Sequence, residues 1–128
     1  MSTNSTNTNS AVKFGRVAVT IPVTDMEKSL RFYVELLGFE KTFENGNPIG
    51  FAILKRDIAE IHLTLAKNHK PTDRNLAHIF VSDVDAFHSH LVNNGVRIIK
   101  GLREVVPGMN GFVFADPDGN RIDIGSSS

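Results

Sequence analysis

The chain has 128 residues and 41% of them are hydrophobic, so it is long enough for one domain with a core and too short for two. Lys plus Arg and Asp plus Glu number 14 each, and neither sign forms a run, which excludes the basic surface typical of proteins that bind nucleic acid or anionic membranes. There is no cysteine and no apolar run long enough to cross a bilayer. We therefore expect a cytoplasmic protein with neither nucleic acid nor membrane as partner.

The two ends of the chain are expected to lie outside the folded domain. Residues 1–11 are mainly Ser, Thr and Asn and contain no apolar stretch, which predicts a disordered N-terminal tail. Residues 126–128 are all Ser and are predicted to form a short C-terminal tail. A single domain is expected over residues 12–125.

The first half of this domain, about residues 12–66, predicts a strand, a helix and three more strands. Residues 17–23 alternate in the pattern of a half-buried strand. Thr24 and Glu27 have the spacing of a capping box, which predicts that the helix begins there, and Gly38 is placed to end it. Three further strands are predicted at residues 39–43, 50–55 and 59–65.

The second half, about residues 76–125, shows the same signals in the same order. Ala77, Ile79 and Val81 alternate, Ser82 to Asp85 opens a second helix, and Asn94-Gly95 closes it. The predicted strands that follow are residues 96–100, 111–115 and 121–124, the last two joined by a turn at Asp116-Pro117-Asp118-Gly119.

The strand-to-helix junctions of the two halves are alike and 58 positions apart, Val23-Thr24-Asp25-Met26 in the first and Val81-Ser82-Asp83-Val84 in the second. This spacing indicates an internal repeat. The predicted fold class is α+β, with two tandem βαβββ units that form a curved mixed sheet with a concave groove.

Five motifs carry a resemblance to a known family: Ile21-Pro22-Val23-x-Asp25, Phe32-Tyr33-x-x-Leu36-Leu37-Gly38-Phe39, Ile61-His62-Leu63, Val81-x-Asp83-Val84-Asp85 and Asp116-Pro117-Asp118-Gly119-Asn120-Arg121. In this order they resemble the vicinal-oxygen-chelate superfamily, which includes glyoxalases, bleomycin resistance proteins and dioxygenases. The chain is most similar to the bleomycin-resistance-like branch. The resemblance implies a homodimer with a ligand site in the groove between the sheets.

The resemblance also places the four ligand positions of the metal-dependent members, and here they fall on Ala18, His62, Leu76 and Asp123. Two of the four side chains cannot bind a metal, so we expect no cofactor. In the alternative, His62, His78 and Asp123 hold a divalent Zn, Ni, Mn or Fe ion. His78 lies two strand residues from the family position, roughly 6.5 Å along the strand, which argues against that set.

The side chains expected to contact a ligand are those that strand alternation places away from the helices. They mix aromatic rings with a few polar groups, as small-molecule sites do. The predicted ligand-binding residues are Phe51, Glu60, His62, His78, Phe80, Arg121 and Asp123. Phe32, Tyr33 and Phe87 are predicted to be core, and His69, His88 and His90 to lie at the surface.

Three functions remain open at this point. The leading hypothesis is a non-enzymatic homodimer of the bleomycin-resistance type that sequesters a small, partly aromatic molecule and so supports antibiotic resistance. The chain is neutral, has no Trp, and has Pro107 where that branch often has Trp, which argues against bleomycin as the natural ligand. The alternatives are a metal-dependent glyoxalase-like lyase or isomerase or a dioxygenase, and an interaction module with a filled groove.

Overall fold

The computed structural model describes residues 10–126. Most of the two predicted tails therefore lies outside the described residues. Ser126 belongs to the last strand, so the domain extends one residue further than the sequence predicts.

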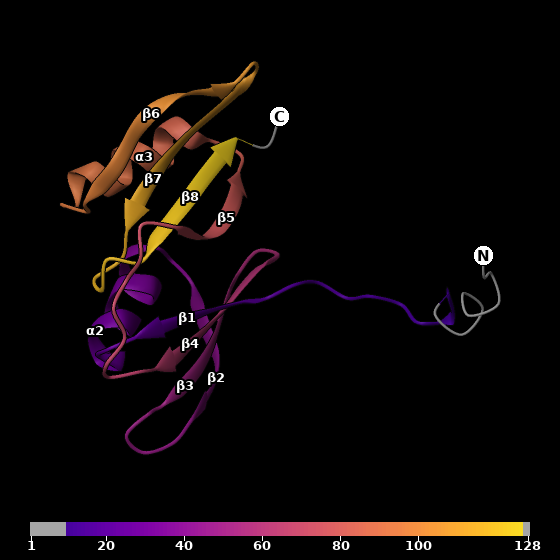
Figure 1. Cartoon of the computed structure of the whole chain (residues 1–128), viewed down its shortest axis with the longest axis vertical. Helices are drawn as coiled ribbons and strands as arrows, with labels where there is room; N and C mark the ends of the chain where they lie inside the picture. The colour runs from indigo at the N-terminus through magenta and orange to yellow at the C-terminus, as the bar shows by residue number, and fades with distance from the viewer. Residues whose placement is uncertain (1–9, 127–128) are drawn as a thin grey trace.

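Each half of the chain forms one four-stranded mixed sheet and contributes one helical segment (Figure 1). The strand orders are β1-β4-β3-β2 and β5-β8-β7-β6; the β1–β4 and β5–β8 pairs are parallel and the others antiparallel. This confirms the two tandem βαβββ units.

The first unit contains β1 (Val19–Val23), α2 (Met26–Leu30), the π-helix η1 (Arg31–Leu36), β2 (Glu40–Asn45), β3 (Phe51–Arg56) and β4 (Ala59–Leu65). The second contains β5 (Asn75–Val81), α3 (Val84–Asn93), β6 (Ile98–Val106), β7 (Met109–Ala115) and β8 (Arg121–Ser126).

The largest difference from the predicted elements is the β6–β7 hairpin. Strand β6 continues to Val106, six residues beyond its predicted end, and β7 begins at Met109. Residues 100–108 are all exposed, so no face of this extension carries the apolar alternation from which a strand is predicted. Gly108, with φ +83°, makes the turn.

Both helices begin with an aspartate and not with the hydroxyl residue before it. Asp25 accepts the backbone N–H of Lys28 at 3.1 Å, and Asp83 accepts that of Ala86 at 3.0 Å. The predicted capping box is therefore wrong. The backbone N–H and hydroxyl of Thr24 both donate to the carboxylate of Asp118 in the other unit. The Thr24 hydroxyl, which was expected to cap the helix, is thus used in a contact between the units.

One hydrophobic core spans both units, and its largest fully buried side chains are Tyr33, Phe112 and Phe114. The ring of Phe32 on η1 lies 6.2 Å from that of Phe114 on β7, and Phe87 on α3 packs on the same ring at 6.2 Å. Helical segments of both units thus contact the same strand, and the three aromatic residues predicted to be core are confirmed.

A buried polar cluster, the Asp116 cluster, joins the units beside this core. Asp116 is only 5% exposed. Its carboxylate accepts hydrogen bonds from the Tyr33 hydroxyl at 2.7 Å and from both the backbone N–H and the side-chain amide of Asn120. Asn120 also donates to the Pro22 carbonyl at 2.9 Å and accepts from His69 at 2.7 Å. Burial raises the pKa values of both Asp116 and Tyr33.

The three histidines outside the candidate site were predicted to lie at the surface; His90 is exposed as predicted, whereas His69 and His88 are half-buried, and all three contact other parts of the chain. His69 binds the buried Asn120, His88 packs edge-on against Phe112 at 5.0 Å, and Nε2 of His90 donates to the Leu36 carbonyl at 2.8 Å. The contacts of His69 and His90 connect segments far apart in the sequence, so neither could be found from local patterns.

We predict that Tyr33→Phe lowers the free energy of unfolding by about 1–3 kcal/mol, because the buried Asp116 carboxylate loses one donor while the ring volume is kept. Urea denaturation monitored by circular dichroism measures this change. Glu27→Gln, which alters only the exposed Glu27–Arg31 pair, is the control and should change stability by about 0.5 kcal/mol or less. Equal effects of the two variants would contradict a structural role of the Asp116 cluster.

Candidate ligand-binding faces

Alternate residues of the inner strands point either into the core or to the opposite side of each sheet. On β4, Ile61 and Leu63 are buried in the core while His62 is half-buried on the other side. On β8, Ile122 and Ile124 are buried in the same way. The seven residues predicted to contact a ligand thus lie on the faces away from the core, Phe51, Glu60 and His62 on the first sheet and His78, Phe80, Arg121 and Asp123 on the second.

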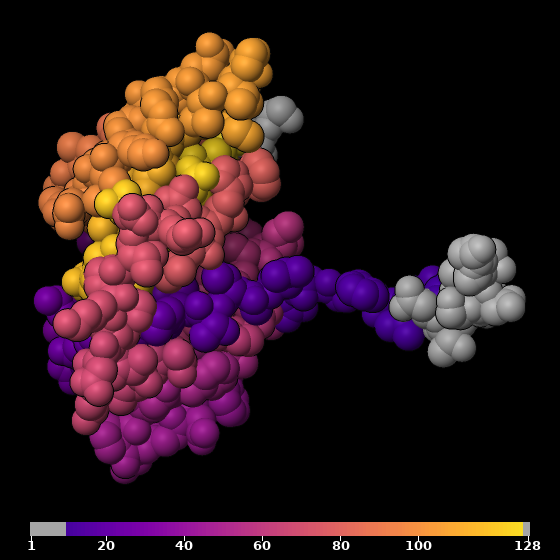
Figure 2. Space-filling view, in the orientation of Figure 1, coloured from indigo at the N-terminus to yellow at the C-terminus, as the bar shows by residue number. Residues whose placement is uncertain are grey.

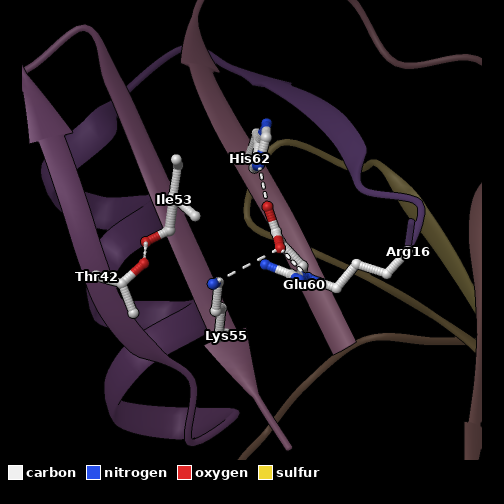
Figure 3. A network of polar contacts seen from close by, with 6 residues as sticks. All are labelled: Arg16, Thr42, Ile53, Lys55, Glu60 and His62. Carbon is white, nitrogen blue, oxygen red and sulfur yellow. Dashed lines mark hydrogen bonds and ion pairs between the residues drawn. The ribbon is translucent and has the colours of Figure 1, made fainter. Parts of the chain in front are cut away.

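On the first sheet, Glu60 is the centre of a polar cluster, the Glu60 cluster (Figure 3). Its carboxylate accepts from Nε2 of His62 at 2.6 Å and from Nε of Arg16 at 2.6 Å, and Nζ of Lys55 lies 3.9 Å away. The His62 hydrogen bond, and then the Arg16 hydrogen bond, lower the pKa of Glu60 below its ordinary value. The ring of Phe51 packs edge-on against His62 with centroids 5.4 Å apart.

Arg16 and Lys55 belong to this cluster although the sequence analysis did not select them. Lys55 has the parity of Phe51 on the same strand and lies opposite Glu60 in the β3–β4 register. Arg16 precedes β1 by three residues and has the parity of Thr20, which lies opposite His62. The alternation rule, extended to the end of β3 and to the residues before β1, would have found both.

On the second sheet, His78, Phe80 and Asp123 form a second group, the His78 cluster. Nδ1 of His78 donates to the Asp123 carboxylate at 2.7 Å, and the His78 and Phe80 rings pack edge-on at 4.5 Å. A Cβ atom at Gly125 would lie 2.9 Å from Nε2 of His78, so glycine leaves the space that the imidazole occupies. Arg121 lies on the same face, and within residues 10–126 its side chain forms no hydrogen bond or ion pair.

The structure does not join the Glu60 and His78 clusters by a hydrogen bond or ring contact within the described residues. Each cluster pairs one imidazole with one carboxylate beside an aromatic ring. The carboxylate fixes which imidazole nitrogen carries a proton, and the ring offers a flat apolar surface. Such a pair can orient a polar group on a flat ligand.

The side chains present do not fit the four-ligand metal site that the resemblance implies. The side chains of Ala18 and Leu76 have no atom that could bind a metal. His62 binds a carboxylate of the first sheet and His78 binds a carboxylate of the second, so the two imidazoles do not share a site. Among residues 10–126, no three His, Asp or Glu side chains converge on one point. The expectation that the protein carries no cofactor stays a prediction.

A cavity of about 750 Å³ lies between the two units. Of the seven predicted residues only Phe80 lines it; the rest of its wall comes from the end of η1, the β3–β4 turn, β5, α3 and β7. The two polar clusters and this cavity are therefore different places in the molecule.

Two mixed sheets, each with a polar and aromatic face turned away from a common core, define a duplicated βαβββ protein. The model of the Glyoxalase/Bleomycin resistance protein/Dioxygenase superfamily matches residues 13–124. The chain belongs to this superfamily.

Solved structures agree with this assignment. A superfamily member from Sphaerobacter thermophilus DSM 20745 is 28% identical, with a TM-score of 0.76 over 91% of this chain and 99% of that one. A bleomycin-binding protein from Streptomyces verticillus, complexed with copper(II)-bleomycin, is 24% identical with a TM-score of 0.73 over 91% and 99%. TioX from Micromonospora sp. ML1 is 16% identical with a TM-score of 0.75 over 90% and 100%. The last two show a shared fold. No curated protein matches the sequence.

The Glu60 cluster gives a prediction that does not depend on a ligand. In an NMR titration the Glu60 carboxyl should titrate at lower pH than an ordinary glutamate, and His62→Phe and Arg16→Gln should each raise its midpoint, His62→Phe more. Arg31→Gln, on the helix and outside the cluster, should leave the midpoint unchanged. If the titration midpoint of Glu60 is the same in the wild type and in both cluster variants, the contacts described for Glu60 are contradicted.

Proposed function

We propose that the protein is a cytoplasmic, small-molecule-binding homodimer of the bleomycin-resistance type that sequesters a partly aromatic ligand. The observation that carries the proposal is that both helix-free faces place a histidine–carboxylate pair beside an aromatic ring. Flat rings of the ligand would bury against Phe51 and Phe80. His62, Arg121 and Asp123 would orient its polar groups.

The ligand is proposed to differ from bleomycin. The Streptomyces verticillus relative binds copper(II)-bleomycin with a similar fold, but its identity to this chain is 24%. This chain has no Trp and equal numbers of acidic and basic residues, so it offers neither a tryptophan surface nor an excess of acidic charge for a cationic glycopeptide. Protection from an uncharged or weakly charged aromatic antibiotic is the role that sequestration would serve.

The segment before β1 supports the dimer. This N-terminal arm, residues 12–17, is held to the first sheet by the Arg16–Glu60 contact, and its leading residues extend away from the body of the molecule (Figures 1 and 2). Phe14 is 91% exposed and Val17 is 88% exposed. Apolar side chains in such an arm gain free energy when a partner surface covers them, and a second copy of the chain is the partner that we propose.

None of the helices in the described part of the chain is long and apolar enough to cross a membrane.

We predict that calorimetric titration with a panel of aromatic antibiotics, bleomycin included, gives saturable heat with at least one of them. Phe51→Ala and His62→Ala should each weaken that binding by roughly tenfold, because each removes a contact on the ligand face. Lys70→Gln, in the exposed linker, is the control. No heat from the whole panel would leave the sequestration proposal without support.

The dimer makes a separate prediction. Light scattering on a sizing column should give the mass of two chains for the wild type. Replacing Phe14 and Val17 together with Ser should shift the equilibrium toward one chain, because the apolar contribution of the arm is lost. A monomeric wild type, or a double variant that dimerises as tightly as the wild type, would contradict the arm as part of the interface.

The alternative function is a metal-dependent lyase, isomerase or dioxygenase, and it requires an ion. We predict that protein purified without chelator contains far less than one equivalent of Ni, Zn, Mn or Fe by elemental analysis. A stoichiometric ion that is lost in His62→Ala, together with an activity that is lost with it, would replace the sequestration proposal by the enzymatic one.

A further inference from the structure

The two contacts between the repeated units differ, although the units themselves are alike. In one contact the β7–β8 turn, residues 116–120, reaches the first unit, where Asp116 binds Tyr33 and Asp118 binds Thr24. The equivalent turn of the first unit joins β3 to β4 through only Asp57 and Ile58. The shorter turn cannot reach as far into the neighbouring unit.

The positions that would receive the shorter turn also differ. At the offset of 58 residues, Thr24 corresponds to Ser82 and Tyr33 corresponds to Leu91, which has no polar group to bind a carboxylate. Beside the long β7–β8 turn the space between the units is about 350 Å³. Beside the short β3–β4 turn it is about 750 Å³. The larger cavity is thus the space between the units that the short β3–β4 turn leaves unfilled.

The wall of this cavity is mainly apolar. It includes Leu37 and Phe39 after η1, Ile79 on the edge strand β5, and Phe87 on α3. Ile58, on the turn, is 92% exposed at its rim. A volume of this size is typical of sites for drug-sized molecules, which occur preferentially between packed units.

Most polar groups of the wall already have partners within the protein. Arg56 donates to the Leu37 carbonyl at 2.7 Å, Asp83 accepts from the Ala86 N–H at 3.0 Å, and His90 donates to the Leu36 carbonyl at 2.8 Å. A charged ligand group would lose its hydration on entering this space, whereas an apolar group only displaces water. The wall therefore favours an uncharged apolar ligand.

We infer that the cavity between the units is a second ligand site, separate from the faces with the Glu60 and His78 clusters, and that it takes an uncharged molecule with an apolar, ring-containing body. Phe80, on the edge strand β5, lines this site and also contacts His78 on the other face. Phe80 is thus the one residue of the His78 cluster that also borders this cavity.

The test uses N-phenyl-1-naphthylamine, an uncharged fluorescent probe, with the full-length protein. We expect saturable fluorescence enhancement with about one probe per chain, and weaker binding of the anionic probe anilinonaphthalene sulfonate. Ala86→Trp, which places an indole in the cavity from the exposed side of α3, should weaken binding of the uncharged probe by about tenfold or more.

The matched control is Val92→Trp, an exposed position on the same helix that does not line the cavity. It should bind the probe as the wild type does, and thermal unfolding of both variants checks that they are folded. His62→Ala should also leave probe binding unchanged, so failure of this inference and failure of the sequestration proposal are distinguishable. Absence of saturable binding, equal binding by the two Trp variants, or loss of binding in His62→Ala would overturn the inference.

Discussion

The structure depends on one buried carboxylate. Asp116 comes from the second unit, and its donors include Tyr33 of the first, so the bond that satisfies this carboxylate also fixes how the two units pack. A buried carboxylate that lacks its donors is costly, which makes alternative arrangements of the units unfavourable. The same arrangement of the units brings Phe32 and Phe87 into contact with Phe114 in the shared core.

Duplication explains why the protein has two polar faces, and divergence explains why they differ. Each face presents a histidine bound to a carboxylate, but His62 binds Glu60 on its own strand whereas His78 binds Asp123 on the neighbouring strand. Within residues 10–126, Lys or Arg side chains lie within 4 Å of the carboxylate on the first face alone, where they are Arg16 and Lys55. The two faces are therefore suited to different polar groups of one ligand or to different ligands.

Local patterns predicted the repeat, the order of elements and the side on which each strand residue lies, because these depend on periodicity within a few residues. They failed where a distant residue decided the outcome. Thr24 binds Asp118 instead of capping its helix, and His69 binds Asn120 instead of lying free at the surface. The extension of β6 to Val106 also escaped prediction, since none of its exposed residues pack on a core.

Gly125 has a consequence for how this sequence can vary. The imidazole of His78 occupies the space where any other residue at position 125 would place its first side-chain carbon. Homologues that carry a larger residue at this position should therefore have lost the histidine or moved it to another strand. Positions 78 and 125 are expected to change together during evolution, and a library randomised at both should recover paired solutions more often than single ones.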